Sequence, residues 1–402
     1  MSASSWRFES SHPHYLASIL ATLMTAADNP GEGSAYRAAG VDYTQLDAGK
    51  RDALTAALAT SPLLAAHGAQ AIDASRGEPA FVFTFGEQTL AFVLEGLGTK
   101  SIIARHVHQQ LGQNRFADVA YDTVAAIVND LCCVGALPLV VNAYFATGSS
   151  DWYADADRQG ALIDGWKRAC QDAGATWGGG ESPTLPEMVS ADDIELAGSA
   201  VGVVPTGHSP ILGSGLQAGD EIVFVTSSGL HANGASLARM LAERKLDDGY
   251  ATKLPSGRAF GEALLDPTRL YVPLVAALMQ RDVPIHYLSH ITGHGMLKLM
   301  RPRAEFTYRI HTLPAVPEVL EFMRDRAEMS PSAAYSTFNM GAGFAVYCAG
   351  GSGADVVSLA AGVGLDAAVS GVVEAGPRRV VLEAVDVTYE SGDMDLTPRR
   401  AA

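Results

Sequence analysis

Several short segments of the chain place glycine beside a charged side chain, a combination suited to binding phosphate or a metal ion. The first is Glu95-Gly-Leu-Gly-Thr-Lys100, which follows an apolar run. Its glycines let the backbone approach a ligand closely, while Lys100 can meet a phosphate group and Glu95 a divalent cation. The glycine spacing before the lysine is shorter than in a P-loop, so an ordinary turn is the alternative interpretation.

Asn129 and Asp130 form a second polar pair, inside the apolar segment 117–134. Burial of an unpaired carboxylate costs roughly several kcal/mol, so a buried Asp130 must have a partner. The apolar neighbours Ile127 and Val128 argue against full exposure. Asp130 is therefore predicted to bind a metal ion or to accept a hydrogen bond, with a helix-surface position as the alternative.

Glycine also marks later segments of the chain. The run Gly178-Gly-Gly-Glu-Ser182 predicts a turn with unusual dihedral angles or a close ligand, because consecutive glycines lose much backbone entropy on folding. The run Ser227-Ser-Gly-Leu-His-Ala-Asn-Gly234 precedes an expected helix, whose N-terminus favours anions. Two further segments of this kind are His290-Ile-Thr-Gly-His-Gly295 and Phe338-Asn-Met-Gly-Ala-Gly343.

Three histidines spaced by four residues raise a separate hypothesis, a zinc site. His286, His290 and His294 would share one face if the segment were a helix, as zinc ligands can. The pair Thr292-Gly293 interrupts such a helix, so the sequence favours separate roles for the three imidazoles.

The composition argues against several classes of partner and location. Lys and Arg number 28 against 44 Asp and Glu, a net charge of −16, and such a surface repels nucleic acid and anionic membranes. We see no signal peptide and no apolar run long enough to span a membrane, so a cytoplasmic protein is expected. Four cysteines show neither a zinc spacing nor a disulfide framework and are expected to be buried free thiols: Cys132, Cys133, Cys170 and Cys348.

At 402 residues, the chain is long enough for two domains. The segment 205–219 is rich in Pro, Gly and Ser and is predicted to link a domain at 36–205 to a second at 219–392, between an N-terminal extension (1–35) and a tail (393–402). The expected helices cover residues 46–65, 117–134, 158–173, 235–245, 259–279 and 316–326. The expected strands cover residues 80–85, 90–94, 139–145, 195–204, 221–225, 306–310, 343–348 and 379–389.

Taken in order along the chain, these segments resemble the aminoimidazole ribonucleotide synthetase family, also called phosphoribosylformylglycinamidine cyclo-ligases. The resemblance covers roughly residues 36–348 and depends on many short motifs in collinear order. The motifs that carry it include Tyr36-Arg-Ala-Ala-Gly-Val-Asp42, Gly96-Leu-Gly-Thr-Lys100, Val128-Asn-Asp-Leu131, Ala146-Thr-Gly148, Gly179-Gly-Glu181, Pro267-Thr-Arg269 and Phe338-Asn339.

The resemblance implies an α+β fold of two domains, with the active site in a cleft between them. It also implies a homodimer in which the N-terminal sheets of two subunits pair into a barrel. The expected cofactors are ATP and Mg²⁺, and the expected substrate is a small ribonucleotide, formylglycinamidine ribonucleotide. ATP would phosphorylate its formyl-amide oxygen, after which the amidine nitrogen attacks the same carbon and closes the imidazole ring.

The resemblance further implies roles for residues of this chain. The residues expected to hold the metal are Glu95, Asp130 and Glu181. The residues expected to act in catalysis are Lys100, which would contact the ATP phosphates, Asp130, His231 and His290. The residues expected to bind the nucleotide are Gly96, Gly98, Thr99, Lys100, Asn129, Gly179, Gly180, Asn233, Thr292 and Asn339.

Two departures from the family pattern keep other functions open. Glu95 stands where the family has an aspartate, and a Gly-Gly-Phe-Gly-Gly type loop has no counterpart, with residues 78–85 in roughly its place. One alternative is a paralogue that uses ATP to activate a different amide or carboxylate. A second alternative is a non-catalytic nucleotide-binding relative. The joint retention of Lys100, Asp130 and Glu181 with Glu95 argues against the second.

Overall fold

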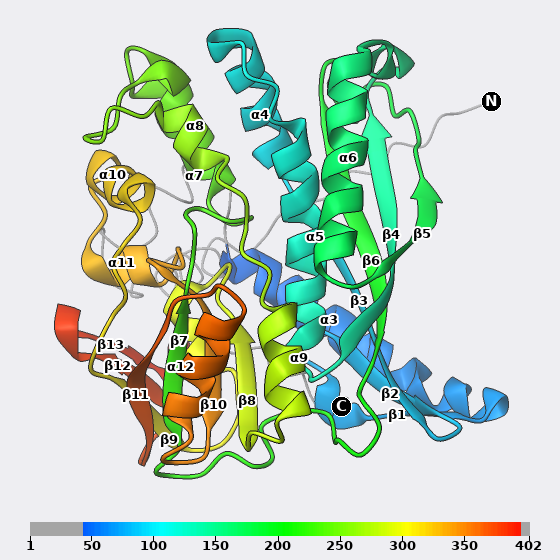
Figure 1. Ribbon diagram of the computed structural model, residues 1–402, viewed down its shortest axis with the longest axis vertical. Helices are drawn as coiled ribbons and strands as arrows, with labels where there is room; N and C mark the ends of the chain where they lie inside the picture. The colour runs from blue at the N-terminus through cyan, green and yellow to red at the C-terminus, as the bar shows by residue number, and fades with distance from the viewer. Residues whose placement is uncertain (1–42, 395–402) are drawn as a thin grey trace, which may run out of the picture.

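The computed structural model describes residues 43–394 and shows two β-sheets, one in each half of the chain, with helices packed against them (Figure 1). The predicted α+β class is confirmed. The first sheet lies within 36–205 and the second within 219–392, and residues 204–220 between them form no helix or strand. The predicted extension at 1–35 lies outside the described residues, and so does the predicted tail from residue 395 onwards.

The first half forms a six-stranded sheet whose neighbours are antiparallel, except for the parallel pair at one edge. In sheet order its strands are β1 (Ala69–Ala71), β2 (Phe81–Phe85), β3 (Gln88–Gly96), β6 (Ile194–Val203), β4 (Leu137–Thr147) and β5 (Thr176–Glu181). The hairpin expected at 80–94 is present as β2 and β3. Its turn contains Gly86 with a φ of 58°, a left-handed conformation that favours glycine.

Three helices pack on one face of this sheet (Figure 1). They are α4 (Lys100–Leu111), α5 (Phe116–Cys132) and α6 (Ala156–Asp172), and a further helix, α3 (Tyr43–Thr60), precedes the sheet. Strand β6 alternates between buried and less buried residues, as expected of a strand with one covered face. The opposite face carries apolar side chains of β3, where Phe92 is 41% and Leu94 68% exposed.

The second half forms a seven-stranded sheet, antiparallel except between β12 and β9. In sheet order its strands are β13 (Val387–Glu390), β12 (Arg379–Leu382), β9 (Phe306–Ile310), β11 (Ala367–Ala375), β7 (Glu221–Thr226), β10 (Ala342–Cys348) and β8 (Ile285–His290). Every residue of β10 is buried, so both faces of this sheet are covered at its centre.

Helices and short 3-10 turns complete the second half, and no helix of the described residues is long and apolar enough to cross a membrane. The helices are α7 (Ala235–Arg244), α8 (Phe260–Leu264), α9 (Val272–Gln280), α10 (Glu318–Arg326), α11 (Pro331–Tyr335) and α12 (Gly353–Gly362). The 3-10 turns within residues 43–394 are Ser61–His67, Asp73–Ser75, Ser150–Ala154, Gly249–Ala251, Gly295–Met300, Glu383–Val385 and Ser391–Asp393.

Three sequence-based expectations were wrong in detail. The helix expected at 259–279 is two helices, because Pro267 lies between them and disfavours helical dihedrals at the residue before it. The strand expected at 379–389 is two antiparallel strands, reversed by a turn at Asp386 with a φ of 53°. The turn expected at 178–182 belongs largely to the edge strand β5, although Gly179 does have an unusual φ of 137°.

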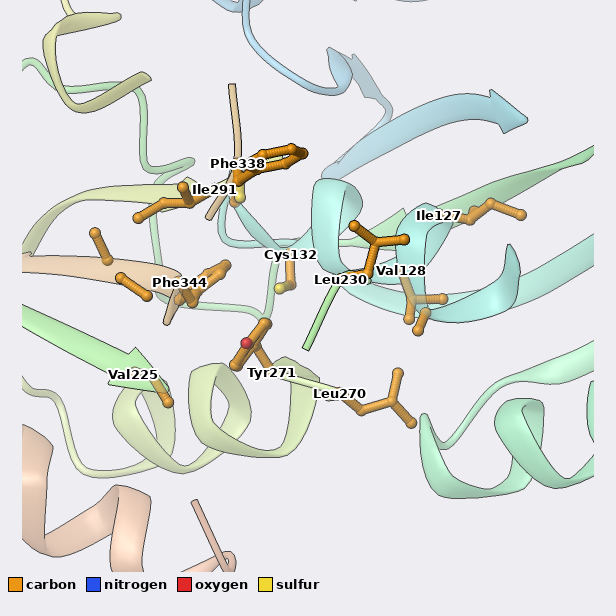
Figure 2. Packing of buried hydrophobic residues seen from close by; sticks show 14 of the residues in the cluster. Ile127, Val128, Cys132, Val225, Leu230, Leu270, Tyr271, Ile291, Phe338 and Phe344 are labelled. Carbon is orange, nitrogen blue, oxygen red and sulfur yellow. The ribbon is translucent and has the colours of Figure 1, made fainter. Parts of the chain in front are cut away.

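Helix α5 joins the cores of the two halves. It packs on β3 and β6 of the first sheet and also contacts α9 of the second half. Figure 2 shows the resulting cluster, with Cys132 from α5 and Tyr271 and Phe344 from the second half. All four cysteines are buried and free, as predicted. The polar residues along α5 are therefore placed at the junction of the two halves.

Candidate active site

A hollow of about 520 Å³ opens where α5 and β3 of the first half meet the end of β8 in the second half. We refer to it as the carboxylate hollow. The charged and polar residues that line it are Lys50, Glu78, Glu95, Asp130, Asn233, His290, Thr292, His294, Lys298 and Arg301. Five of the residues predicted from the sequence to act in one site thus line a single hollow, together with Gly96.

Glu95 and Asp130 meet in this hollow because of where each lies on its element. Glu95 is near the end of β3 and shares the helix-covered side of that strand with the buried Ala91 and Val93. Asp130 is in the last turn of α5, which packs on β3. The two side chains are hydrogen-bonded to each other, so one proton is shared between two carboxyl groups when no cation is bound.

The two carboxyl groups differ in pKa. Burial, reinforced by the charge of Asp130, raises the pKa of Glu95 to about 8. Burial would also raise the pKa of Asp130, but the hydrogen bond from His290 and nearby positive charges outweigh it and hold that pKa below its usual value. Near neutral pH Asp130 is therefore the ionised member of the pair, and Glu95 holds the proton.

His290 and Lys298 are two residues of the second half that line the hollow. The Nδ1 atom of His290 lies 2.6 Å from Asp130 Oδ1, and its Nε2 atom is buried with no partner among the described residues. Lys298 donates to the hydroxyl of Thr292 and, at 3.3 Å, to the carbonyl of His290. Burial and the charge of Arg301 lower the pKa of Lys298 to about 8. His290 and Lys298 thus line the same hollow as the two carboxylates.

Lys100 lies elsewhere, at the start of α4, and its side chain is fully buried. Its ammonium group is 2.5 Å from Asp122 Oδ2 and donates to the carbonyl of His231 at 2.8 Å. Contact with ATP phosphates would require the ammonium to leave these partners, and it stays a prediction. In the described structure Lys100 holds a loop of the second half against the first.

His231 takes up a strained conformation in that loop, with a φ of 59°. Its Nε2 atom accepts a hydrogen bond from the Ser228 backbone at 3.1 Å, so the ring does not face the carboxylate hollow. Burial, with the charges of His290 and Lys100, lowers its pKa well below the usual value. His231 is therefore a neutral imidazole at pH 7, and a catalytic role for it stays a prediction.

The three predicted asparagines bind backbone groups. Asn129 donates to the carbonyl of Arg269 and accepts from the N–H of Tyr271, both at 2.8 Å. Asn339 accepts from the N–H of Gly341 and donates to the carbonyl of Gly229. Asn233 lines the carboxylate hollow, with its amide donating to the Thr337 carbonyl.

Asn129 and Asn339 thus shape the loops around the site, and direct contact of either side chain with a nucleotide stays a prediction.

Glu181 and its two glycines lie away from the hollow. Glu181 is exposed at the end of β5, and in the sheet order β3-β6-β4-β5 it is three strands from Glu95, about 14 Å at the usual strand spacing. A Cβ atom at Gly180 would clash with the Ala143 carbonyl of β4, so close strand packing explains that glycine. The roles predicted for Gly179, Gly180 and Glu181 stay predictions, and the structure does not bring them to the other site residues.

The segment after β3 approaches the second half directly. Gly98 has a φ of 70°, which lets the chain turn into α4. The hydroxyl of Thr99 lies 3.3 Å from that of Ser236 in α7. Gly96 therefore borders the hollow, whereas Gly98 and Thr99 form the turn behind it.

Sequence reasoning missed four charged residues of the hollow: Lys50, Glu78, Lys298 and Arg301. None of them stands in a glycine-rich segment. Lys298 and Arg301 do fall in Gly295–Met300 and just after it, a 3-10 turn that follows the His290 motif. The signal that could have revealed Lys298 and Arg301 was the presence of two cationic side chains in a largely apolar stretch of sequence.

The donor set of the hollow fits a hard divalent cation. Mg²⁺ prefers carboxylate oxygens and is commonly held by one or two carboxylates together with substrate phosphates. Glu95 and Asp130 supply such a pair. When both are ionised they repel each other, and a bound cation would offset this repulsion. His286, His290 and His294 do not converge: the first two bond to Asp220 and Asp130, respectively.

The two-domain α+β fold places this chain in a known structural class. Two solved structures share the fold: a HypE–HypF complex (TM-score 0.55, 15% identity, 78% of this chain and 92% of that one) and a ThiL complexed with AMPPCP and TMP (TM-score 0.52, 17% identity, 78% and 90%). At such identities the likeness shows the fold alone.

The sequence comparison is more specific. Residues 77–204 match the family described as AIR synthase related protein, N-terminal domain, and residues 217–383 match the corresponding C-terminal domain. A phosphoribosylformylglycinamidine cyclo-ligase of Methanobrevibacter smithii is 32% identical over 271 residues, 67% of this chain and 76% of that protein. One from Anaeromyxobacter is 35% identical over 314 residues, 75% and 85%. The chain belongs to the AIR synthase related family, and it is an enzyme of this ATP-dependent ligase family.

Proposed function

We propose that the protein closes formylglycinamidine ribonucleotide to aminoimidazole ribonucleotide at the expense of ATP, in purine synthesis. The observation that carries this proposal is the carboxylate hollow, where Glu95 and Asp130 of the first half face His290 and Lys298 of the second. The relatives named as cyclo-ligases support the choice of substrate. The fold likeness to a ThiL complexed with AMPPCP supports ATP as the co-substrate.

The residues of the hollow suit the two steps of this reaction. Glu95 and Asp130 would hold Mg²⁺, which would offset the negative charge of the transferring phosphate. Lys298 adds a cation on the opposite side of the same space. The Nε2 atom of His290 is buried and has no partner among the described residues, and it would accept the proton that the amidine nitrogen loses on ring closure. Asp130, bonded to Nδ1 of the same ring, fixes its orientation.

The test is phosphate release from ATP and Mg²⁺, measured with and without formylglycinamidine ribonucleotide. Release that depends on the substrate and yields an aminoimidazole product is the expected result. Phosphate release that formylglycinamidine ribonucleotide does not increase, in protein shown to be folded, would overturn the proposal. Release that depends on another amide or carboxylate would identify a paralogue. A purine auxotroph that lacks its own cyclo-ligase provides a second assay, because the chain should restore its growth.

We also infer that the protein acts as a homodimer joined through the open face of the first sheet. Phe92 and Leu94 expose large apolar side chains on that face, and such patches usually mark interfaces. Leu94→Asp should give a monomer by light scattering. Leu63→Asp, at a residue 70% exposed on a 3-10 turn outside the sheet, is the matched control and should leave the dimer intact. A wild-type chain that is monomeric at micromolar concentration would contradict this inference.

A further inference from the structure

A second hollow, also of about 520 Å³, lies beside the carboxylate hollow and shares Gly77, Glu78 and Arg301 with it. Its walls come from residues 73–78 of the first half, residues 209–214 between the sheets, and residues 301–304 of the second half. Arg378 and Met394 close it from the end of the described chain. We call it the arginine hollow.

Positive charge gathers in the arginine hollow although the protein as a whole is acidic. Four arginines line it (Arg76, Arg301, Arg303 and Arg378) against two carboxylates (Asp73 and Glu78). The whole chain carries a net charge of −16. Burial raises the pKa of Glu78, so this carboxylate offsets less positive charge than a solvated one would. The local excess of cations is therefore opposite to the general trend of the molecule.

Arg301 is half-buried, and its guanidinium group is not fully hydrogen-bonded. Its side chain donates no hydrogen bond and has no carboxylate within 4.0 Å among the described residues, and its Nε atom is buried. The nearest candidate, Glu78, instead accepts the Tyr287 hydroxyl at 2.7 Å. Burial opposes the charge of Arg301, but the neighbouring Tyr287, Glu78 and Asp130 outweigh it and raise the pKa of Arg301, so what the group lacks is a hydrogen-bond acceptor for its Nε–H. An anionic ligand at this position would supply the missing partner.

Arg76 and Arg378 are held by neutral groups and not by carboxylates. Arg76 donates to the Ser61 hydroxyl at 2.8 Å and lies over the Phe81 ring at 4.1 Å. Arg378 donates to the carbonyl of Met394 at 2.6 Å. Within the described range 43–394, neither has a carboxylate in salt-bridge distance. Such anchoring fixes the guanidinium groups in place without neutralising them.

We propose that the arginine hollow binds the phosphate group of a small phosphorylated ligand, with Arg301 and Arg303 as its principal contacts. Guanidinium groups match phosphate oxygens in geometry and charge, often with two parallel hydrogen bonds. The apolar part of the wall, including Leu212 and Pro302, accommodates the remainder of a ligand of nucleotide or sugar-phosphate size. This site is argued from the arginines alone and does not depend on the ring-closure reaction.

Calorimetric titration of the full chain in EDTA tests the proposal, with inorganic phosphate, ribose 5-phosphate and ATP as separate probes. At least one probe should bind, and the one that binds best identifies whether free phosphate, a sugar phosphate or a nucleotide is the source of the group. Arg301→Gln and Arg303→Gln should each weaken that binding by about tenfold or more, the usual effect of losing a charge-assisted hydrogen bond. Arg244→Gln, an exposed arginine at the end of α7, is the matched control and should have no effect.

The two variants separate this site from its neighbour. Arg303 lines only the arginine hollow, whereas Arg301 lines both. A loss confined to Arg301→Gln would place the phosphate in the carboxylate hollow and overturn the proposal, as would the absence of binding by all three probes. Because Arg303 is exposed, its variant is expected to fold normally, which circular dichroism would verify. Ring-closure activity can fail while this binding is present, and the reverse also holds, so the two proposals fail independently.

Discussion

Helix α5 carries two buried aspartates in contrasting surroundings. Asp122 and Asp130 are eight residues apart, or about 12 Å along the helix. The Asp122 side chain is fully buried and bonds to Lys100 and, at 2.6 Å, to the backbone N–H of Thr268. The Asp130 side chain keeps 12% of its surface exposed and borders the carboxylate hollow. One carboxylate is closed by protein on every side, and the other faces a space that a ligand can enter.

The pKa values follow the same division. Burial raises the pKa of Asp122, although Lys100 pulls it down. At Asp130 the hydrogen bond from His290 and the nearby positive charges together outweigh burial, so its pKa lies below the usual value. Both arrangements use opposite charge to hold a carboxylate inside the protein. Only Asp130 is partly exposed to a hollow that a ligand can enter, so we expect Asp122 to contribute to stability, and the metal-binding role of Asp130 stays a prediction.

The largest expected effect is a loss of activity when the partly exposed carboxylate of Asp130 is neutralised. Asp130→Asn keeps the shape of the side chain and removes its charge, so phosphate release should fall by about 100-fold or more, as when a group that stabilises transition-state charge is lost. The melting temperature should change little. A phosphate-release assay at saturating ATP measures the effect, and activity within threefold of wild type would remove Asp130 from the proposed metal site.

The next effect is a loss of protein stability when the fully buried carboxylate of Asp122 is removed. Asp122→Ala leaves Lys100 as a buried cation without its ionic partner, which should lower the free energy of unfolding by about 3–5 kcal/mol. Urea denaturation measures this loss. Asp164→Ala is the matched control: it breaks the exposed ion pair with Lys167 and should cost about 0.5 kcal/mol or less.

A second variant checks the cause of that loss. Replacing both partners, as in Lys100→Met with Asp122→Leu, should recover much of the stability, because no buried charge is then left unpaired. If the double variant is as unstable as Asp122→Ala alone, the ion pair is not what the single substitution destroys.

The smallest effect concerns pH and Glu95. Its pKa of about 8 in the folded protein lies above the unfolded value of 4.5, so the folded state binds more protons between these values. Without metal, stability from this group is present below pH 4.5 and is lost as the pH rises towards 8. Mg²⁺ affinity should change in the opposite sense and increase with pH over the same window, because the metal displaces the proton.

Glu95→Gln tests both trends at once. The variant should bind Mg²⁺ more weakly and with little pH dependence between pH 6 and 9, and its metal-free melting temperature should vary less with pH than that of wild type. Titration calorimetry and thermal melts measure the two quantities. A wild-type protein whose Mg²⁺ affinity is flat over this range would show that Glu95 is not a ligand.

The sequence predicted the surroundings of Asp130 better than those of Asp122, for a physical reason. Asp130 could be singled out because a charged residue among Ile127 and Val128 demands a partner, and Glu95 because it precedes a glycine-rich turn. Asp122 sits in the same helix, but nothing local distinguishes it from a surface position. Its partner Lys100 was predicted to contact phosphate. A lysine at the start of a helix can point towards a ligand or into the protein, and only tertiary packing decides between the two.

The fold shows the same limit. Periodicity predicted most helices and strands, because burial on one or two faces leaves a local pattern in the sequence. It did not show that Gly178–Gly180 lie in an edge strand, because the close approach of β4, which leaves no room for a side chain at Gly178 or Gly180, is a tertiary contact. Nor could it place Lys298 and Arg301 in the site, because they lie in and just after the 3-10 turn that follows β8, and only the fold brings that turn to the carboxylates of the first half.

The position of α5 also sets an order of events during protein synthesis. Asn129 bonds to residues 140 and 142 positions later in the chain, and Asp130 bonds to a residue 160 positions later. At roughly 5–20 residues per second, the ribosome needs roughly 7–30 s to deliver the first of these partners after α5 itself. Until then Asn129 and Asp130 lack these partners, although Asp122 of the same helix can already pair with Lys100. The end of α5 therefore reaches its full set of hydrogen bonds only after residue 290 of the second half has been made.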